Sequence, residues 1–243
     1  MSAIVIGASS GLGRALAGEL AAQKHDLLLV ASDPRDLEAL AADLNLRHDV
    51  AVRTLALDLG REPDPGAAIL AALDGLSAPD ALLLPIGMSR DDDELSLDPA
   101  AIGQLLAINL HAPLAIAHAL LPRLLESRGS VVLFGSIAAV RGRGRNVVYA
   151  SAKRGLVSFY ESLRQRYRPE ELRVQLYQLG FLATNLTHGM RLPTAPAEPA
   201  VIARAVVKRL RGKSSLRYLP EKFELIALIV RMLPWFLYRR MKG

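Results

Sequence analysis

The sequence predicts one α/β domain, a doubly wound parallel sheet of about seven strands with helices on both faces. Three observations predict it. Short apolar, β-branched runs alternate with helix-forming segments along all 243 residues, an alternation typical of parallel strands joined by crossover helices. A glycine-rich turn follows the first run, and polar motifs follow later ones. Because ligands of such sheets bind beyond the carboxyl ends of the strands, these motifs predict a site there.

The expected elements follow the chain in a regular order. The longest helix is expected from about Pro99 to Leu125, with helices also filling the other intervals between strands. We see no internal repeat and no second domain, so we expect one domain over 1–222 and an amphipathic tail over 223–243. The strands are expected near 3–6, 26–31, 51–57, 81–85, 130–135, 173–179 and 215–219.

Composition narrows the class of protein. Apolar residues make up 51% of the chain, a globular value, and no cysteine is present, which excludes disulfides and thiolate metal sites. We expect no metal. A cytoplasmic location is expected because a chain without cysteine suits a reducing compartment and because the N-terminus runs directly into the first strand without a signal peptide. A net charge of +6 would allow a nucleic-acid partner, but no aromatic platform or known binding module accompanies it, so none is expected.

The glycine-rich turn reads Gly7-Ala8-Ser9-Ser10-Gly11-Leu12-Gly13 and opens a helix that runs to about Gln23. Its glycines allow a tight turn and a close backbone approach, and the helix N-terminus offers free N–H groups to a pyrophosphate. The Gly-x-x-x-Gly-x-Gly spacing differs from the common dinucleotide fingerprint, and an ordinary loop is the alternative. The preceding strand and the following helix favour a nucleotide site.

Tyr149 and Lys153 lie four positions apart, which is one helical turn, so both side chains share a helix face. A free tyrosine has a pKa near ~10. A cation one turn away would stabilise the phenolate and move the Tyr149 pKa toward the range where acid–base catalysis is efficient.

Together these motifs resemble the short-chain dehydrogenase/reductase family, and the resemblance covers most of the chain. It includes Asp58-Leu59, Asn109, and Ser136, which stands thirteen residues before Tyr149, as well as the run Gly180-Phe181-Leu182-Ala183-Thr184. The resemblance implies a Rossmann-type catalytic domain over 1–222. It also implies an NAD(P)-dependent oxidoreductase that reduces a carbonyl to an alcohol, or the reverse.

The resemblance assigns roles to four residues. Tyr149 would donate a proton to the carbonyl oxygen, and Ser136 would hold that oxygen by a hydrogen bond. Lys153 would lower the Tyr149 pKa and bind the nicotinamide ribose, while Asn109 would hold a water that links Lys153 to solvent. The structural alternatives are a core tyrosine, a solvated lysine, a helix-capping serine and a buried asparagine.

The resemblance also implies the residues that contact the cofactor. The chain has Leu84-Pro85-Ile86-Gly87 where relatives usually carry Asn-Asn-Ala-Gly, so the usual bracing of the central strands must come from elsewhere. It also has Leu179-Gly180 where Pro-Gly is usual. The implied cofactor residues are Gly7, Ser9, Ser10, Gly11, Leu12, Gly13, Ser32, Arg35, Asp58, Leu59, Gly87, Tyr149, Lys153, Gly180, Leu182 and Thr184.

Cofactor choice is expected at the end of the second strand. The position where a carboxylate would bind the ribose 2′-hydroxyl is Ala31, and Asp33 is expected to start the next helix. Ser32 with Arg35 could instead hold a 2′-phosphate. NADP(H) is therefore expected in preference to NAD(H), which stays the alternative.

Basic residues lie between Ser136 and Tyr149. Arg141, Arg143 and Arg145 would suit a phosphate, since arginine makes bidentate contacts with such anions. We expect Ser136, Arg141 and Tyr149 to contact the substrate. The alternative is a solvated basic loop.

The tail combines an apolar surface with a basic end. It is too short and too interrupted to span a bilayer, but its composition fits a helix in a membrane interface. The alternative is packing against a second subunit, in a homodimer or homotetramer, or over the pocket. The residues that suggest the membrane are Trp235, Tyr238, Arg239, Arg240 and Lys242.

The tail, the arginine loop and Asn146-Val147-Val148-Tyr149 weakly resemble one branch of the family, the reductases of polyprenyl-phosphate-linked 2-keto sugars. This resemblance implies a lipid-linked or phosphorylated keto sugar as substrate, and a peripheral position on the inner face of the cell membrane. One alternative is a soluble carbonyl or 3-oxoacyl-type reductase whose tail is an oligomer interface. Another is a non-catalytic nucleotide sensor, but a sensor has no reason to keep a proton relay.

Overall fold

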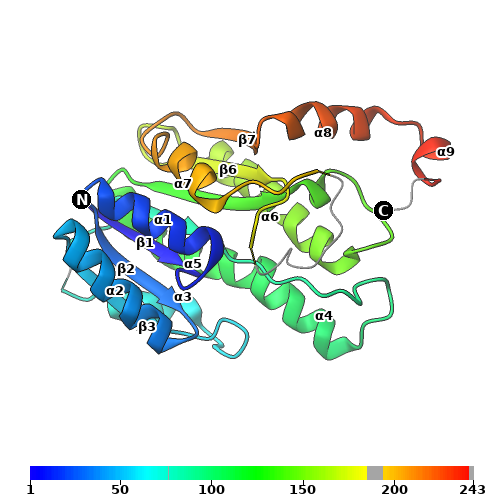
Figure 1. Cartoon of the computed structure of the whole chain (residues 1–243). Coiled ribbons are helices and arrows are strands. Elements are labelled where there is room, and N and C mark those ends of the chain that lie inside the picture. Colours follow the sequence, from blue (N-terminus) through cyan, green and yellow to red (C-terminus); the bar gives the residue numbers. More distant parts are fainter. Residues whose placement is uncertain (76, 185–193, 241–243) are drawn as a thin grey trace.

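The computed structural model describes residues 1–75, 77–184 and 194–240. It contains a parallel sheet of seven strands in the order β3-β2-β1-β4-β5-β6-β7, as the sequence predicts (Figure 1). The strands are β1 (Ser2–Ile6), β2 (Asp26–Ala31), β3 (Val52–Ala56), β4 (Ala81–Leu84), β5 (Ser130–Ser136), β6 (Arg173–Leu179) and β7 (Ser215–Leu219).

Helices connect the strands. A π-helical segment, η1 (Ala107–His111), joins α4 and α5 into the long helix expected from Pro99 to Leu125, and a 3₁₀ segment, η2 (Ile137–Val140), follows β5. The α-helices are α1 (Gly11–Ala22), α2 (Pro34–His48), α3 (Pro65–Ala72), α4 (Pro99–Leu106), α5 (Ala112–Glu126), α6 (Val147–Arg166), α7 (Pro199–Val207), α8 (Lys222–Met232) and α9 (Trp235–Tyr238).

Both faces of the sheet are covered. Helices α1, α2 and α7 pack on one face, and α3, α5 and α6 pack on the other (Figure 1). Successive strand residues point to opposite faces of the sheet. Val5 packs in the apolar cluster with α1, α2 and α7, whereas its neighbours Ile4 and Ile6 pack in the cluster with α3, α5 and α6. This burial on both faces explains why the strands are continuous apolar runs instead of alternating ones.

Aspartate–proline pairs start several helices. Asp33, Asp64 and Asp98 each precede a proline at the first helical position, and each side chain accepts a backbone N–H from the first turn. An aspartate cap satisfies an otherwise unpaired N–H, and proline there loses no hydrogen bond. The expectation that Asp33 starts a helix is confirmed.

By length and composition alone, the helix over Pro99–Glu126 is long and apolar enough to cross a membrane. Its residues Leu105, Ile116 and Leu120 are fully buried, and the latter two pack in the cluster beneath the sheet. It is therefore a core helix of this domain.

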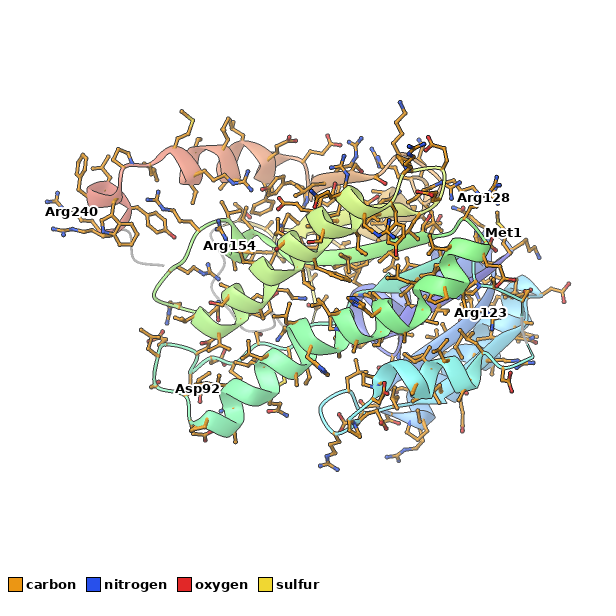
Figure 2. All side chains as sticks on the ribbon, turned by 180° about the vertical axis from the view of Figure 1, so that it is seen from behind. Met1, Asp92, Arg123, Arg128, Arg154 and Arg240 are labelled. Carbon is orange, nitrogen blue, oxygen red and sulfur yellow. The ribbon has the colours of Figure 1, made fainter. Side chains whose placement is uncertain are left out.

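The last two helices form what we call the C-terminal arm, residues 222–240. Phe223 and Ala227 of α8 pack with Val140 and Tyr218, which attaches the arm beside β7. The arm runs along the outer edge of the molecule, and α9 extends beyond its body (Figure 1). Figure 2 shows Arg240 at the far end, with many arm side chains directed away from the domain. Residues 241–243, including Lys242, lie outside the described part.

Candidate active site

A cavity of about 480 Å³ opens at the carboxyl ends of the strands, where the sheet order reverses between β1 and β4. That is the position expected for a ligand in a doubly wound sheet. Gly13, Arg35, Asn109 and Arg141 do not line it. The predicted site residues that line it are Gly7, Ser9, Ser10, Gly11, Leu12, Ser32, Asp58, Leu59, Gly87, Ser136, Tyr149, Lys153, Gly180, Leu182 and Thr184.

The glycine turn forms one end of this cavity. Gly7 has φ of +84°, which favours glycine, and its N–H donates to the Val30 carbonyl at 2.7 Å. A Cβ on Gly13 would lie 1.9 Å from the Gly7 carbonyl oxygen, so Gly13 serves helix–strand packing and not the cavity wall. Ser10 precedes α1 at the N-cap position but its side chain makes no capping hydrogen bond, and no acidic residue stands in the first turn. This open helix N-terminus fits a pyrophosphate.

The end of β2 offers no free carboxylate. Asp33 accepts the backbone N–H groups of Arg35 and Asp36, at 2.8 and 3.4 Å, and is used as a cap. Ser32 lines the cavity, whereas the Arg35 side chain is not part of its wall. Of the two residues expected to hold a 2′-phosphate, the structure therefore brings only Ser32 to the site.

Lys153 and Asn109 brace the segment after β4 that lacks the usual asparagines. Lys153 Nζ donates to the carbonyl oxygens of Ile86, at 2.6 Å, and Phe134, at 3.1 Å. Asn109 is fully buried in η1, where it accepts from the Met88 N–H at 3.1 Å and donates to the Met88 carbonyl at 2.8 Å. The Asn109 side chain thus fixes this loop, a role the sequence did not reveal, and its contact with a water stays a prediction.

Tyr149, Ser136 and Lys153 meet in the cavity. Tyr149 and Lys153 share a face of α6, with Lys153 Nζ 5.9 Å from the centroid of the Tyr149 ring. Ser136, at the end of β5, forms a side-chain hydrogen bond with Tyr149. The structure thus brings together the three residues that the sequence predicts for proton transfer, while Asn109 does not line the cavity.

Burial governs the charges of this group. It raises the pKa of Tyr149, against the lowering effects of the Ser136 hydrogen bond and the nearby Arg143 guanidinium. It also lowers the pKa of Lys153 from 10.5 to about 7. The expectation that Lys153 depresses the Tyr149 pKa is therefore wrong for this structure, because burial raises the pKa of Tyr149 and also keeps the Lys153 amine from charging readily. Tyr149 is a protonated phenol at neutral pH, the form that can donate a proton.

Sequence reasoning missed Asp93. This carboxylate is 1% exposed and accepts the backbone N–H groups of Val148 and Tyr149, both at 3.0 Å. Asn146, which precedes α6, has φ of 53° and provides no side-chain cap, so Asp93 supplies the cap from a distant loop. It therefore positions the first turn of α6, which carries Tyr149. In the sequence it is one of three consecutive aspartates, which look like a solvated acidic run.

The three arginines of the basic loop have different surroundings. Arg141 donates to the carbonyls of Val230 and Leu233, and its guanidinium lies 4.2 Å from the centroid of the Tyr238 ring. Arg145 pairs with Glu94 at 2.6 Å on the surface. Only Arg143 lines the cavity. The expectation that Arg141 contacts the substrate is corrected, because Arg141 holds the C-terminal arm instead.

The arm reaches the edge of the cavity through its first residues. A Cβ on Gly180 would lie 2.1 Å from the Phe223 ring, and the rings of Phe181 and Phe223 meet edge to face at 6.0 Å. Glycine after β6 is thus required by the arm. In the described ranges, no group of three or more His, Cys, Asp or Glu residues could hold a metal ion.

Comparison with known proteins gives the family. The family model for short chain dehydrogenases matches residues 1–194. The chain belongs to this family. It is an oxidoreductase, and the predicted family and fold are confirmed.

Individual relatives are likewise oxidoreductases, reductases or dehydrogenases. An uncharacterized oxidoreductase of Mycobacterium tuberculosis is 26% identical over 98% of this chain and 96% of its own length. The 3-oxoacyl-[acyl-carrier-protein] reductase of Escherichia coli is 26% identical over 88% of this chain and 85% of its own. The solved structure of a short-chain dehydrogenase from Sphingobium yanoikuyae in complex with NADPH superimposes with a TM-score of 0.83 and is 25% identical, covering 100% of this chain and 96% of that one.

Proposed function

We propose that the protein reduces a carbonyl to an alcohol with NADP(H), with Tyr149 as the general acid. Tyr149 gives its proton to the carbonyl oxygen while Ser136 holds that oxygen by a hydrogen bond. Bound nicotinamide would supply the hydride to the carbonyl carbon. The observation that carries the proposal is the protonated, half-buried Tyr149 hydrogen-bonded to Ser136 in the cavity at the sheet edge. Lys153, which lines the same cavity, would bind the nicotinamide ribose and later return a proton to Tyr149.

The preference for NADP(H) over NAD(H) is also part of the proposal. Support comes from the end of β2, where Ser32 lines the cavity and Asp33 is engaged as a helix cap. With Asp33 engaged, the end of β2 has no free carboxylate that would repel a 2′-phosphate. The Sphingobium relative was solved with NADPH. Tighter binding of NADH than of NADPH would contradict this preference.

For the substrate we propose a carbonyl compound that is phosphorylated or lipid-linked, such as a keto sugar. Arg143 at the cavity supports the anionic part, and the C-terminal arm, with exposed apolar side chains and the basic Arg239 and Arg240, supports the lipid part. The protein would then act in the cytoplasm, peripherally on the inner face of the membrane. No nucleic acid is part of this proposal.

A second candidate is a soluble carbonyl or 3-oxoacyl-type reductase, a homodimer or homotetramer with the arm as its subunit interface. It is favoured by the 3-oxoacyl reductase among the relatives and by the same exposed apolar side chains. The two candidates differ in what covers the arm: lipid in the first, a second copy of the chain in the other.

Replacement of Tyr149 by phenylalanine tests the chemistry. Tyr149→Phe keeps the ring but removes the proton donor, so we expect carbonyl-dependent NADPH oxidation to fall by about 10²–10⁴-fold while NADPH binding, followed by fluorescence titration, is retained. Tyr167→Phe, on a tyrosine that does not line the cavity, is the matched control. Turnover by Tyr149→Phe within a few-fold of the unmutated protein would refute the assignment.

A further inference from the structure

Arg143 lies between two cavities. It lines the catalytic cavity and also a second cavity, of about 610 Å³, between the basic loop and the C-terminal arm. The second cavity has apolar and aromatic walls that include Val230, Trp235 and Tyr238. A molecule whose carbonyl lies beside Tyr149 would therefore pass Arg143 before it reaches the arm.

The charge of Arg143 has no partner within the residues that the structure describes. Its Nε is buried without a hydrogen-bond acceptor, and the guanidinium makes no hydrogen bond or ion pair within residues 1–75, 77–184 and 194–240. Residues 185–193, which lie outside that part, include no aspartate or glutamate. By contrast, Arg141 is bonded to two carbonyls and Arg145 to Glu94.

An unpaired, partly buried guanidinium is costly, because removing a charge from water is repaid only by an opposite charge or by hydrogen bonds. Burial lowers the pKa of Arg143, and the groups that act on it are Tyr238, Tyr149 and the like-charged Arg145. No carboxylate is among them. A surface arginine with no role in binding would be expected to extend its guanidinium into solvent. The arginine nevertheless lines both cavities.

We propose that Arg143 binds an oxyanion of the carbonyl substrate, a phosphate or a carboxylate, placed between the reacting carbonyl and the second cavity. The planar guanidinium matches such a group with two parallel hydrogen bonds. This inference rests on the proposed function and adds to it the residue that recognises the substrate's charge. Arg143 thereby selects anionic ketones over neutral ones.

A binding experiment tests the site without turnover. The protein is saturated with NADPH, so that the cofactor's own phosphate contacts are filled, and inorganic pyrophosphate is titrated by calorimetry. We expect Arg143→Gln to weaken pyrophosphate binding by about 10- to 100-fold, the range for one charged hydrogen-bonded contact, and Arg143→Lys to restore part of it. Arg145→Gln is the matched control and should bind like the unmutated protein. Tyr149→Phe should also bind pyrophosphate normally.

A pair of substrates then tests selectivity. Acetoacetate and methyl acetoacetate share the ketone but differ in charge. We expect Arg143→Gln to lower kcat/KM for acetoacetate by about tenfold or more relative to that for the ester, since only the acid can use the guanidinium. An effect of Arg143 on the Tyr149 pKa would change kcat/KM for both substrates alike. The ratio of the two kcat/KM values therefore isolates the contact with the anion.

Two results would overturn the proposal. One is equal pyrophosphate affinity for Arg143→Gln, Arg145→Gln and the unmutated protein. The other is an unchanged ratio of kcat/KM for the acid and the ester. If the unmutated protein reduces neither ketone, the proposed function fails for this substrate class, and the pyrophosphate titration alone decides whether Arg143 is an anion site.

Discussion

The catalytic cavity and the C-terminal arm differ in which side chains they bury: polar side chains are buried around the cavity, and apolar side chains are exposed on the arm. Around the cavity, Asn109, Asp93 and Lys153 are at most 3% exposed, and each makes two or more hydrogen bonds to backbone groups. On the arm, large apolar side chains face solvent, with Met232 74% and Trp235 64% exposed. Of the thirteen large apolar side chains exposed among the described residues, eight belong to the arm.

This difference indicates which groups stabilise each region. Buried polar groups are stable only when hydrogen-bonded, and around the cavity the fold itself supplies the bonds. An exposed apolar patch of this kind usually marks contact with a membrane or another protein, so we propose that the partner of the arm lies outside the chain. Mutations should therefore destabilise the fold at the cavity but change association at the arm.

The largest effect on stability is expected at Asp93. Asp93→Ala leaves the N–H groups of Val148 and Tyr149 without an acceptor and removes a charge that interacts favourably with the α6 N-terminus. We expect the free energy of unfolding to fall by about 2–3 kcal/mol, measured by urea denaturation. Asp92→Ala is the control: Asp92 pairs with Arg90 on the surface, and its loss should change stability little. Equal effects of the two substitutions would refute the capping role of Asp93.

At the arm we expect a loss of binding without a loss of stability. Trp235→Ser with Phe236→Ser removes two side chains that are 64% and 58% exposed, so the unfolding free energy should hardly change. If the arm inserts into a membrane interface, affinity for anionic vesicles should fall by about 2 kcal/mol, measured by co-sedimentation. Leu46→Ser is the control, because Leu46 is an exposed leucine of α2 and not part of the arm.

The salt dependence and the oligomeric state separate the two candidates for the arm. Binding to anionic vesicles should weaken as salt rises, because Arg239 and Arg240 add electrostatic attraction. If instead the protein stays in the supernatant with vesicles at low salt, and the Trp235 and Phe236 substitutions dissociate a dimer or tetramer in analytical ultracentrifugation, the arm is a subunit interface.

A smaller effect, on the pH dependence of stability, is expected for Lys153. Burial lowers its pKa in the folded protein to about 7, whereas the unfolded chain keeps the ordinary value of 10.5. Between those pH values the unfolded chain binds the extra proton, so stability rises with pH, by up to about 1.4 kcal/mol per unit. Lys153→Met should lack this rise when both proteins are unfolded by urea at several pH values in this window. Parallel pH profiles would show that Lys153 titrates normally.

The smallest effect is expected for Arg35, which the sequence placed at the cofactor. Its side chain does not line the cavity, so Arg35→Ala should change NADPH affinity by about 0.5 kcal/mol or less, the usual range for a surface substitution. Ser32→Asp, at the cavity wall, is the contrasting variant and should weaken NADPH relative to NADH, because a carboxylate repels the 2′-phosphate. A large loss of NADPH affinity in Arg35→Ala would show that the arginine reaches the cofactor after all.

The sequence by itself determined the fold and most of the cavity. The strands at 26–31, 173–179 and 215–219 occur as predicted, because a buried parallel strand requires a local run of apolar residues. The glycine turn and the Tyr149–Lys153 pair were equally readable, since a tight turn and one helical turn each depend on residues only a few positions apart.

Only the tertiary structure decided which polar residues serve the site. Asp93 meets Tyr149 across 56 positions of sequence, and Arg141 meets Val230 across 89. The neighbouring sequence does not distinguish Asp93 from Asp92, or Arg143 from Arg141. Only folding buries Asp93 against α6 and places Arg143 in the cavity wall. The direction of the Tyr149 pKa was decided in the same way: the spacing of Lys153 predicts a lowered value, but burial, which depends on every element packed around the cavity, raises it.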